Sequence, residues 1–136
     1  MEEVKNWLES FPGWGDKVLH LDLLPAQPGS AGLFPKGDTL LEMKEDLLGN
    51  VRCRCARQFQ LLITVCDCAA DWMAQFQDWV AQQSFLGLGP RFGEEQTLRA
   101  EKGQLKERTA AGSAVYTVTL TAEFVKKFME GNYGKD

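Results

Sequence analysis

The stretch that decides the fold runs from Val51 to Val65 and reads VRCRCARQFQLLITV. Its side chains alternate between two faces, which is the two-residue period of a β-strand. The stretch contains no turn residue that would fold the chain back on itself. We therefore predict one long strand at the centre of a sheet, and an amphipathic helix that follows it.

Two Cys-x-Cys pairs lie in and just after this strand, Cys53/Cys55 and Cys66/Cys68. Four thiolates are sufficient for a tetrahedral zinc site. Residues two apart in a strand share a face, so Cys53 and Cys55 point together. The second pair has the opposite parity and would lie roughly 40 Å from Cys53, at about 3.3 Å per residue. We therefore interpret the cysteines as small apolar packing residues and expect no metal site and no cofactor.

Composition and charge are those of an ordinary globular chain. The 136 residues suit one domain, with 44% hydrophobic and 25% charged residues. We expect this domain over residues 1–130 and a flexible tail over 131–136. The formal net charge of −4 argues against a general nucleic-acid binder, so we expect no sequence-specific nucleic-acid partner.

Targeting signals are not apparent in the sequence. The N-terminus is acidic and lacks the apolar region of a signal peptide. No apolar run approaches the roughly 18 residues that a membrane span needs. We therefore expect synthesis in the cytoplasm and no membrane partner.

The segments before the long strand predict a helix, a short strand and a hairpin. The helix is indicated by apolar residues at helical spacing, Val4, Trp7, Leu8 and Phe11. Residues 17–24 alternate as a strand, and 35–38 are predicted to be a turn. Residues 39–48 nearly alternate and are followed by Gly49-Asn50, which is typical of a two-residue hairpin turn. We therefore predict that 39–48 pairs with the long strand.

The segments after the long strand predict one helix and two further strands. The helix should run from Asp71 to Gln83, with Asp71 as its N-cap. Its aromatic face is expected in the core and consists of Trp72, Phe76, Trp79 and Val80. Thr97 to Thr109 is expected to be an exposed strand broken at Gly103, and Ala114 to Phe124 a strand inside the sheet. This order predicts an α+β fold with a mainly antiparallel sheet and two helices packed on one face.

Catalysis has little support in the sequence. His20 is the one histidine, and Asp22 follows it two residues later in a strand, which could orient the imidazole for base chemistry. An exposed histidine on a strand is the simpler interpretation. We therefore expect that the protein is not an enzyme.

Candidate contact residues come from the polar, edge-like segments. Arg52 and Arg54 share a strand face and, with the nearby Arg57, form a basic cluster that suits a partner's carboxylates. The segments 39–48 and 97–109 are expected to be arms that contact another subunit or a partner. The candidate contacts are Leu41, Met43, Arg52, Arg54, Arg99 and Lys102.

The order of elements resembles a known family. The segments that carry the resemblance are VKNWLESF (4–11), LHLDLLP (19–25), RQFQLLI (57–63), FQDWVAQQ (76–83), LGPRFGE (88–94) and AVYTVTLT (114–121). Over roughly residues 4–124 the chain resembles the minor capsid or tail-terminator-like proteins of tailed phages and of prophages in Gram-positive bacteria. Its loop at residues 86–93 departs from the family pattern Leu-Pro-x-Leu-Gly, and the cysteines are not a family hallmark.

The resemblance implies a structural protein of the virion, at the tail or the head–tail interface, made in the bacterial cytoplasm. Such proteins form a ring, commonly hexameric, that contacts the tail tube protein and a head-completion protein. That role requires a rigid sheet and a heterologous subunit interface that closes on itself. The residues alone leave two alternatives open: a small cytoplasmic protein- or peptide-binding module, and a zinc or thiol-redox protein that uses the cysteine pairs.

Overall fold

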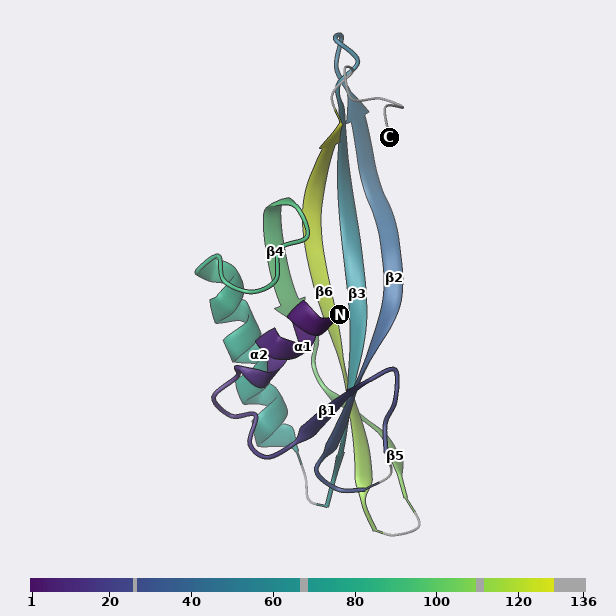
Figure 1. Cartoon of the computed structure of the whole chain (residues 1–136), viewed down its shortest axis with the longest axis vertical. Helices are drawn as coiled ribbons and strands as arrows, with labels where there is room; N and C mark the ends of the chain where they lie inside the picture. The colour runs from purple at the N-terminus through teal and green to yellow at the C-terminus, as the bar shows by residue number, and fades with distance from the viewer. Residues whose placement is uncertain (26, 67–68, 110–111, 129–136) are drawn as a thin grey trace.

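The alternating run at residues 51–65 forms one strand, β3 (Val51–Val65), at the centre of the sheet. The computed structural model describes residues 1–25, 27–66, 69–109 and 112–128. Within these ranges the chain has two helices and a six-stranded sheet (Figure 1). β3 pairs antiparallel with β2 (Ser30–Glu45) on one side and with β6 (Ala114–Phe128) on the other. The predicted α+β class and the central position of β3 are confirmed.

The pairing of β3 with β6 is the regular part of the sheet. The two strands keep one register over all 15 residues of each. Because apolar side chains alternate along both strands, the opposed pairs Phe59–Leu120 and Leu61–Val118 fall on the same face and are buried. β6 continues to Phe128, four residues past its predicted end.

Two helices, α1 (Glu2–Glu9) and α2 (Ala70–Phe85), cover this face. Phe76 of α2 is fully buried, and the predicted aromatic face of this helix is confirmed as core. Phe11 meets Phe76 edge-on with ring centroids 5.4 Å apart, and Trp72 stacks on Phe76 at 5.3 Å. The predicted N-cap is wrong: Ala69 occupies that position, and Asp71 lies inside the first turn.

The predicted hairpin exists, but its first strand is longer than expected. β2 begins at Ser30, and residues 35–38 form no turn, because the strand continues through them with a register shift between Pro35 and Gly37. A second shift separates Leu40 from Glu42. Such bulges let a strand keep its partner while it bends.

The hairpin turn spans residues 46–50 and is not the two-residue turn that Gly49-Asn50 predicted. The Asp46 carboxylate accepts hydrogen bonds from the backbone N–H groups of Leu48 at 2.9 Å and Asn50 at 3.0 Å. An aspartate that bonds its own downstream backbone is typical of turns. These hydrogen bonds hold the turn at residues 46–50.

The N-terminal strand is shorter than residues 17–24. It is β1 (Val18–Leu21), which pairs parallel with the start of β2. Asp22 adopts a left-handed backbone with φ of 59° and ends the strand. Trp14, in the preceding turn, is buried, and its indole N–H donates to the Lys17 carbonyl at 3.0 Å.

The segment 97–109 is not a projecting arm. It contributes to two strands, β4 (Glu94–Ala100) and β5 (Gln104–Arg108), separated near Gly103 as predicted. Each of them pairs with β6, so neither forms a hairpin with the other. The tail predicted for residues 131–136 lies outside the described residues.

β2, β3 and β6 extend past the helix layer (Figure 1). The loop at residues 86–93 follows the last helix of that layer and packs closely against β6. At Gly93 the approach is so close that an added Cβ would lie 2.7 Å from the Phe124 ring. Beyond this point β2, β3 and β6 continue to the turn at 46–50. We call this projection, residues 40–55 and 124–128, the arm.

Candidate functional site

The arm presents an apolar surface on the side that the helices cover further down. Strand register places three cross-strand rows there: Leu40–Cys55–Phe124, Met43–Cys53–Lys126 and Glu45–Val51–Phe128. Met43 is 63% exposed, Leu40 57% and Phe128 47%. We call Leu40, Met43, Cys53, Cys55 and Phe128 the arm patch. Apolar side chains gathered at this exposure are typical of an association surface.

The cysteines contribute to packing on this surface. Cys53 and Cys55 are free thiols, half-buried, and share the face of the arm patch, as their spacing predicts. Cys66 is exposed just after the far end of β3, and Cys68 lies outside the described residues. Among the residues that the structure describes, no group of three or more His, Cys, Asp or Glu side chains could hold a metal ion.

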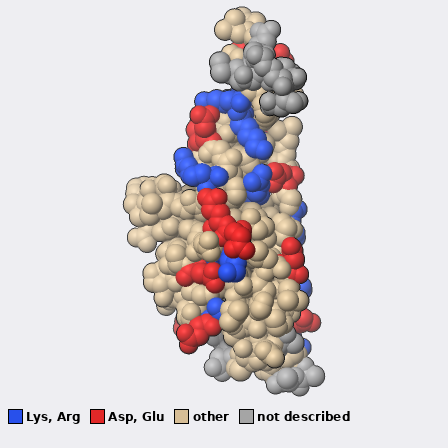
Figure 2. Space-filling model, viewed as in Figure 1, with Lys and Arg blue, Asp and Glu red and all other residues tan. Residues whose placement is uncertain are grey.

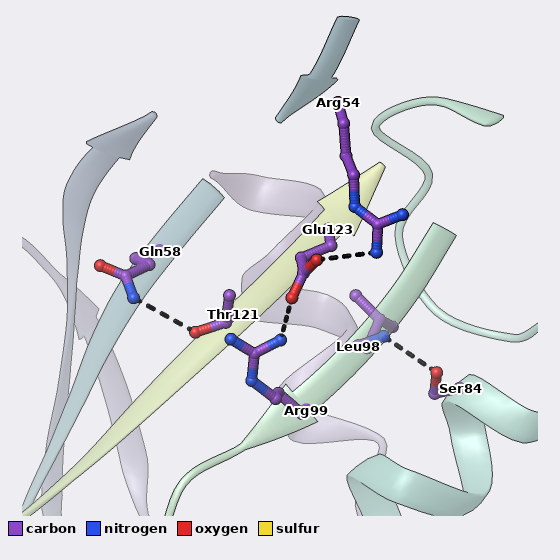
Figure 3. A network of polar contacts seen from close by, with 7 residues as sticks. All are labelled: Arg54, Gln58, Ser84, Leu98, Arg99, Thr121 and Glu123. Carbon is purple, nitrogen blue, oxygen red and sulfur yellow. Dashed lines mark hydrogen bonds and ion pairs between the residues drawn. The ribbon is translucent and has the colours of Figure 1, made fainter. Parts of the chain in front are cut away.

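At the base of the arm, the opposite face of the sheet carries an ion-pair network (Figure 3). Arg54 donates to Glu123 at 3.1 Å, and Arg99 of β4 donates to the other oxygen of the same carboxylate. The hydrogen bond from Arg99, and then that from Arg54, lowers the pKa of Glu123 below its usual value. One carboxylate therefore joins β3, β6 and β4.

The predicted basic cluster is neutralised by neighbouring acids. Arg52 bonds Glu95 at 2.6 Å, and Lys127 lies 3.3 Å from Glu94. Arg57 lies on the opposite face of the sheet from Arg52, paired with an acid of β2. In Figure 2 blue and red side chains alternate over the upper part of the molecule, so this surface is mixed in sign.

Below the network the same face is lined by amides and hydroxyls. The Gln58 amide donates to the Thr121 hydroxyl at 3.4 Å, and the Gln60 amide donates to the Thr117 hydroxyl at 2.7 Å. These side chains bond across β3 and β6 and are half-buried or buried. These polar side chains bond one another, in contrast to the exposed apolar side chains of the arm patch.

The structure separates the predicted contact residues into three places. Leu41, 48% exposed, and Met43 lie on β2 in the arm. The arginines 52, 54 and 99 lie on the ion-pair face. Lys102 is exposed in the connection between β4 and β5, past Ala100, whose partner on β6 is Leu120, and so it lies away from the arm.

Sequence reasoning missed Glu123 and most of the arm patch. The strand parity of residues 114–124 puts Glu123 on the face of Thr121, but only the pairing of β4 with β6 reveals Arg99 as its partner. Leu40 is an ordinary residue of a predicted strand, and Phe128 lies past the predicted end of the last strand. Their exposure follows from where the helix layer ends, and no local pattern indicates this.

The structure does not place His20 and Asp22 on one strand face, as the histidine–carboxylate hypothesis requires. His20 is half-buried on β1, whereas the interpretation from sequence was an exposed residue. Asp22 lies beyond the end of the strand, in the left-handed backbone conformation. The two residues therefore do not share a strand face as the alternation suggested.

Comparisons with protein families and with curated proteins found no match. In the described part of the chain, neither helix is both long and apolar enough to cross a membrane.

Proposed function

We propose that this protein is a non-catalytic structural subunit that assembles with further copies of itself through its arm. The observation that carries the proposal is the arm patch, which lies beyond the helix layer with Leu40, Met43 and Phe128 exposed. Burying such side chains against a partner releases about 25 cal/mol per Å² of apolar surface. A rigid sheet that carries them past the body of the domain suits contact between subunits.

The biological setting of the proposal comes from the sequence resemblance. We propose a ring component in phage tail completion or head–tail joining, with the tail tube protein and a head-completion protein as further partners. The arm supports this setting in one respect: a ring requires a surface that projects toward a neighbouring subunit. Genes for the major tail and tape-measure proteins directly downstream would support the setting, and their absence would argue against it.

Full-length protein tests the assembly. We expect oligomers in sedimentation velocity over a concentration series, and rings in negative-stain electron microscopy. Met43→Asp should give a folded monomer, because it puts a charge in the centre of the arm patch. Leu23→Asp is the matched control, since Leu23 is 55% exposed but lies outside the arm. Wild-type protein that stays monomeric at every concentration, or a Met43→Asp variant that assembles normally, would contradict the proposal.

A second candidate is a protein- or peptide-binding module that works by strand addition. β1 pairs with β2 only from Ser30 to Leu33, and within the described residues no strand pairs with that edge of β2 further along. An open edge offers backbone N–H and C=O groups to an added strand. Monomeric wild-type protein that captures extended peptides from a random library would favour this function over self-assembly.

A further inference from the structure

A second exposed apolar surface lies at the end of α2. Phe85 is 90% exposed, and Leu86 and Leu88 are more than half exposed. We call these three residues the knob. In Figure 1 the end of α2 projects to the left of the sheet, and the same projection in Figure 2 shows no charged side chain. A phenylalanine this exposed contributes little to the fold of its own chain, so its burial requires another molecule.

The knob is held in place by the body of the domain. The Ser84 hydroxyl accepts a hydrogen bond from the Leu98 backbone N–H at 2.9 Å, which ties the last turn of α2 to β4 (Figure 3). One residue earlier, the Gln83 side chain accepts a bond from the Trp7 indole at 3.0 Å. Phe85 therefore follows a fixed turn of helix, and little conformational entropy would be lost when a partner covers it.

The arm patch and the knob lie on different parts of the same chain. The arm patch is on the sheet beyond the helix layer, and the knob is on the outer end of that layer. A twofold contact of arm against arm would leave every knob exposed. A contact of arm against knob buries one of each per interface and repeats from copy to copy, which makes the association heterologous. The occupant that this arrangement fits is a second copy of the chain.

Two charges of opposite sign, Glu45 and Arg91, lie at the rims of the two surfaces, and the arm also carries an exposed lysine, Lys126, in its middle row. Glu45 stands in the last row of the arm, beside Val51, and is exposed. Arg91 follows the knob by three residues and is exposed as well. In the described ranges neither side chain takes part in a salt bridge, so both charges are available to a neighbouring copy. Opposite charges at the rim of an apolar contact fix its orientation.

We propose that the arm patch of one copy docks on the knob of the next copy, in a head-to-tail contact with Glu45 facing Arg91. This inference rests on the proposed function and names its interface. The contact closes into a ring if the rotation per copy divides a full turn, and otherwise continues as a filament.

Mixing two defective variants tests the inference. The Met43→Asp variant has a damaged arm patch and an intact knob. The Phe85→Asp variant has an intact arm patch and a damaged knob. Each alone should be a monomer, with the contact weakened at least about 30-fold by loss of a central apolar anchor. Mixed in equal amounts they should form a 1:1 heterodimer and nothing larger, because only one arm and one knob are intact. Leu23→Asp should assemble as wild type, and circular dichroism should show that all variants are folded.

The outcomes separate the inference from the proposed function. If Phe85→Asp assembles as wild type does, the knob is not the docking site, yet self-assembly through the arm stands. If both variants are monomeric and the mixture is too, arm and knob do not meet, and the inference is overturned. If wild-type protein itself never assembles, the proposed function fails and the inference with it.

A charge exchange tests the orientation. Glu45→Arg and Arg91→Glu should each weaken assembly several-fold, since each places like charges together. The double variant should recover wild-type assembly. A double variant weaker than either single one would show that the two charges do not face each other, and would overturn the proposed contact.

Discussion

Asp38 and Arg57 lie opposite each other on β2 and β3 and share two parallel hydrogen bonds, each 2.8 Å long. The guanidinium of Arg57 also lies over two aromatic rings, 5.0 Å from the centroid of Phe92 and 5.4 Å from that of Phe124. This pair stands where the helix layer ends and the arm begins. It therefore couples the base of the arm to the loop that closes the core.

Replacing Arg57 by Lys should lower the free energy of unfolding by about 1 kcal/mol. A lysine keeps the charge but cannot form the two parallel hydrogen bonds to Asp38 or stack on the aromatic rings as a guanidinium does. Urea unfolding measures the change. Arg54→Lys is the control, because Arg54 makes a single bond to Glu123 from a more exposed position and should cost less than about 0.5 kcal/mol. Equal losses in the two variants would contradict this account.

Stability should fall on acidification, and Glu123 should account for part of that fall. Hydrogen bonds from Arg99 and Arg54 lower the pKa of Glu123, and the hydrogen bond from Arg57 does the same for the pKa of Asp38. A carboxyl with a lowered folded pKa stabilises the fold above its unfolded pKa, 4.5 for Glu and 3.8 for Asp. That stabilisation is lost as the pH falls through the folded value.

Glu123→Gln tests this dependence. At neutral pH the variant should be less stable than wild type by roughly 1 kcal/mol, and the difference should shrink as the pH falls below 4.5 and through the lowered pKa of Glu123. Unfolding curves at a series of pH values measure it. A difference that stays constant over the whole range would show that the glutamate acts through its shape and not through its charge.

Phe76→Ala should cost about 3–5 kcal/mol, because the ring is fully buried and contacts three aromatic neighbours. The matched control on the same helix is Phe85→Ala, at a side chain that is largely exposed. It should change the stability of the monomer by less than about 0.5 kcal/mol. A large loss in Phe85→Ala under monomeric conditions would mean that the knob packs within its own chain.

Gly93→Ala should cost about 1–3 kcal/mol. Its new Cβ would lie 2.7 Å from the Val125 carbonyl oxygen as well as from the Phe124 ring, and the β6 backbone cannot move away without losing its pairing with β3. Gly103→Ala is the contrast. There the close atoms belong to the Met73 side chain, which can rotate away. Thermal unfolding of both variants should show the larger loss at position 93.

The sequence predicts the parts of this fold that depend on local periodicity. Alternation identifies β3 and β6, and the spacing of the aromatic residues identifies the buried face of α2. The first half of β2 escapes prediction because Pro35 and Gly37 interrupt its alternation, and only pairing with β3 makes it a strand.

The candidate site depends on relationships that no local pattern contains. The alternation along each strand predicts the sheet face of Arg54 and of Glu123. The two side chains meet because β3 and β6 are neighbours, and Arg99 joins them because β4 pairs with β6. The exposure of Met43 and of Phe85 depends on where the helix layer stops. Element type is therefore predictable here, whereas the surfaces follow from tertiary packing.

The pairing of β3 with β6 also means that β3 must wait for its second partner during synthesis. β6 is the last described strand, so β3 leaves the ribosome long before its second partner exists. At about 5–20 residues per second, translation from Val65 to Phe128 takes roughly 3 to 13 seconds. During that time β3 has only the β2 hairpin beside it, and one of its edges can pair with another nascent chain. The newborn protein is therefore most prone to aggregate in this interval, and it passes once β6 has been added.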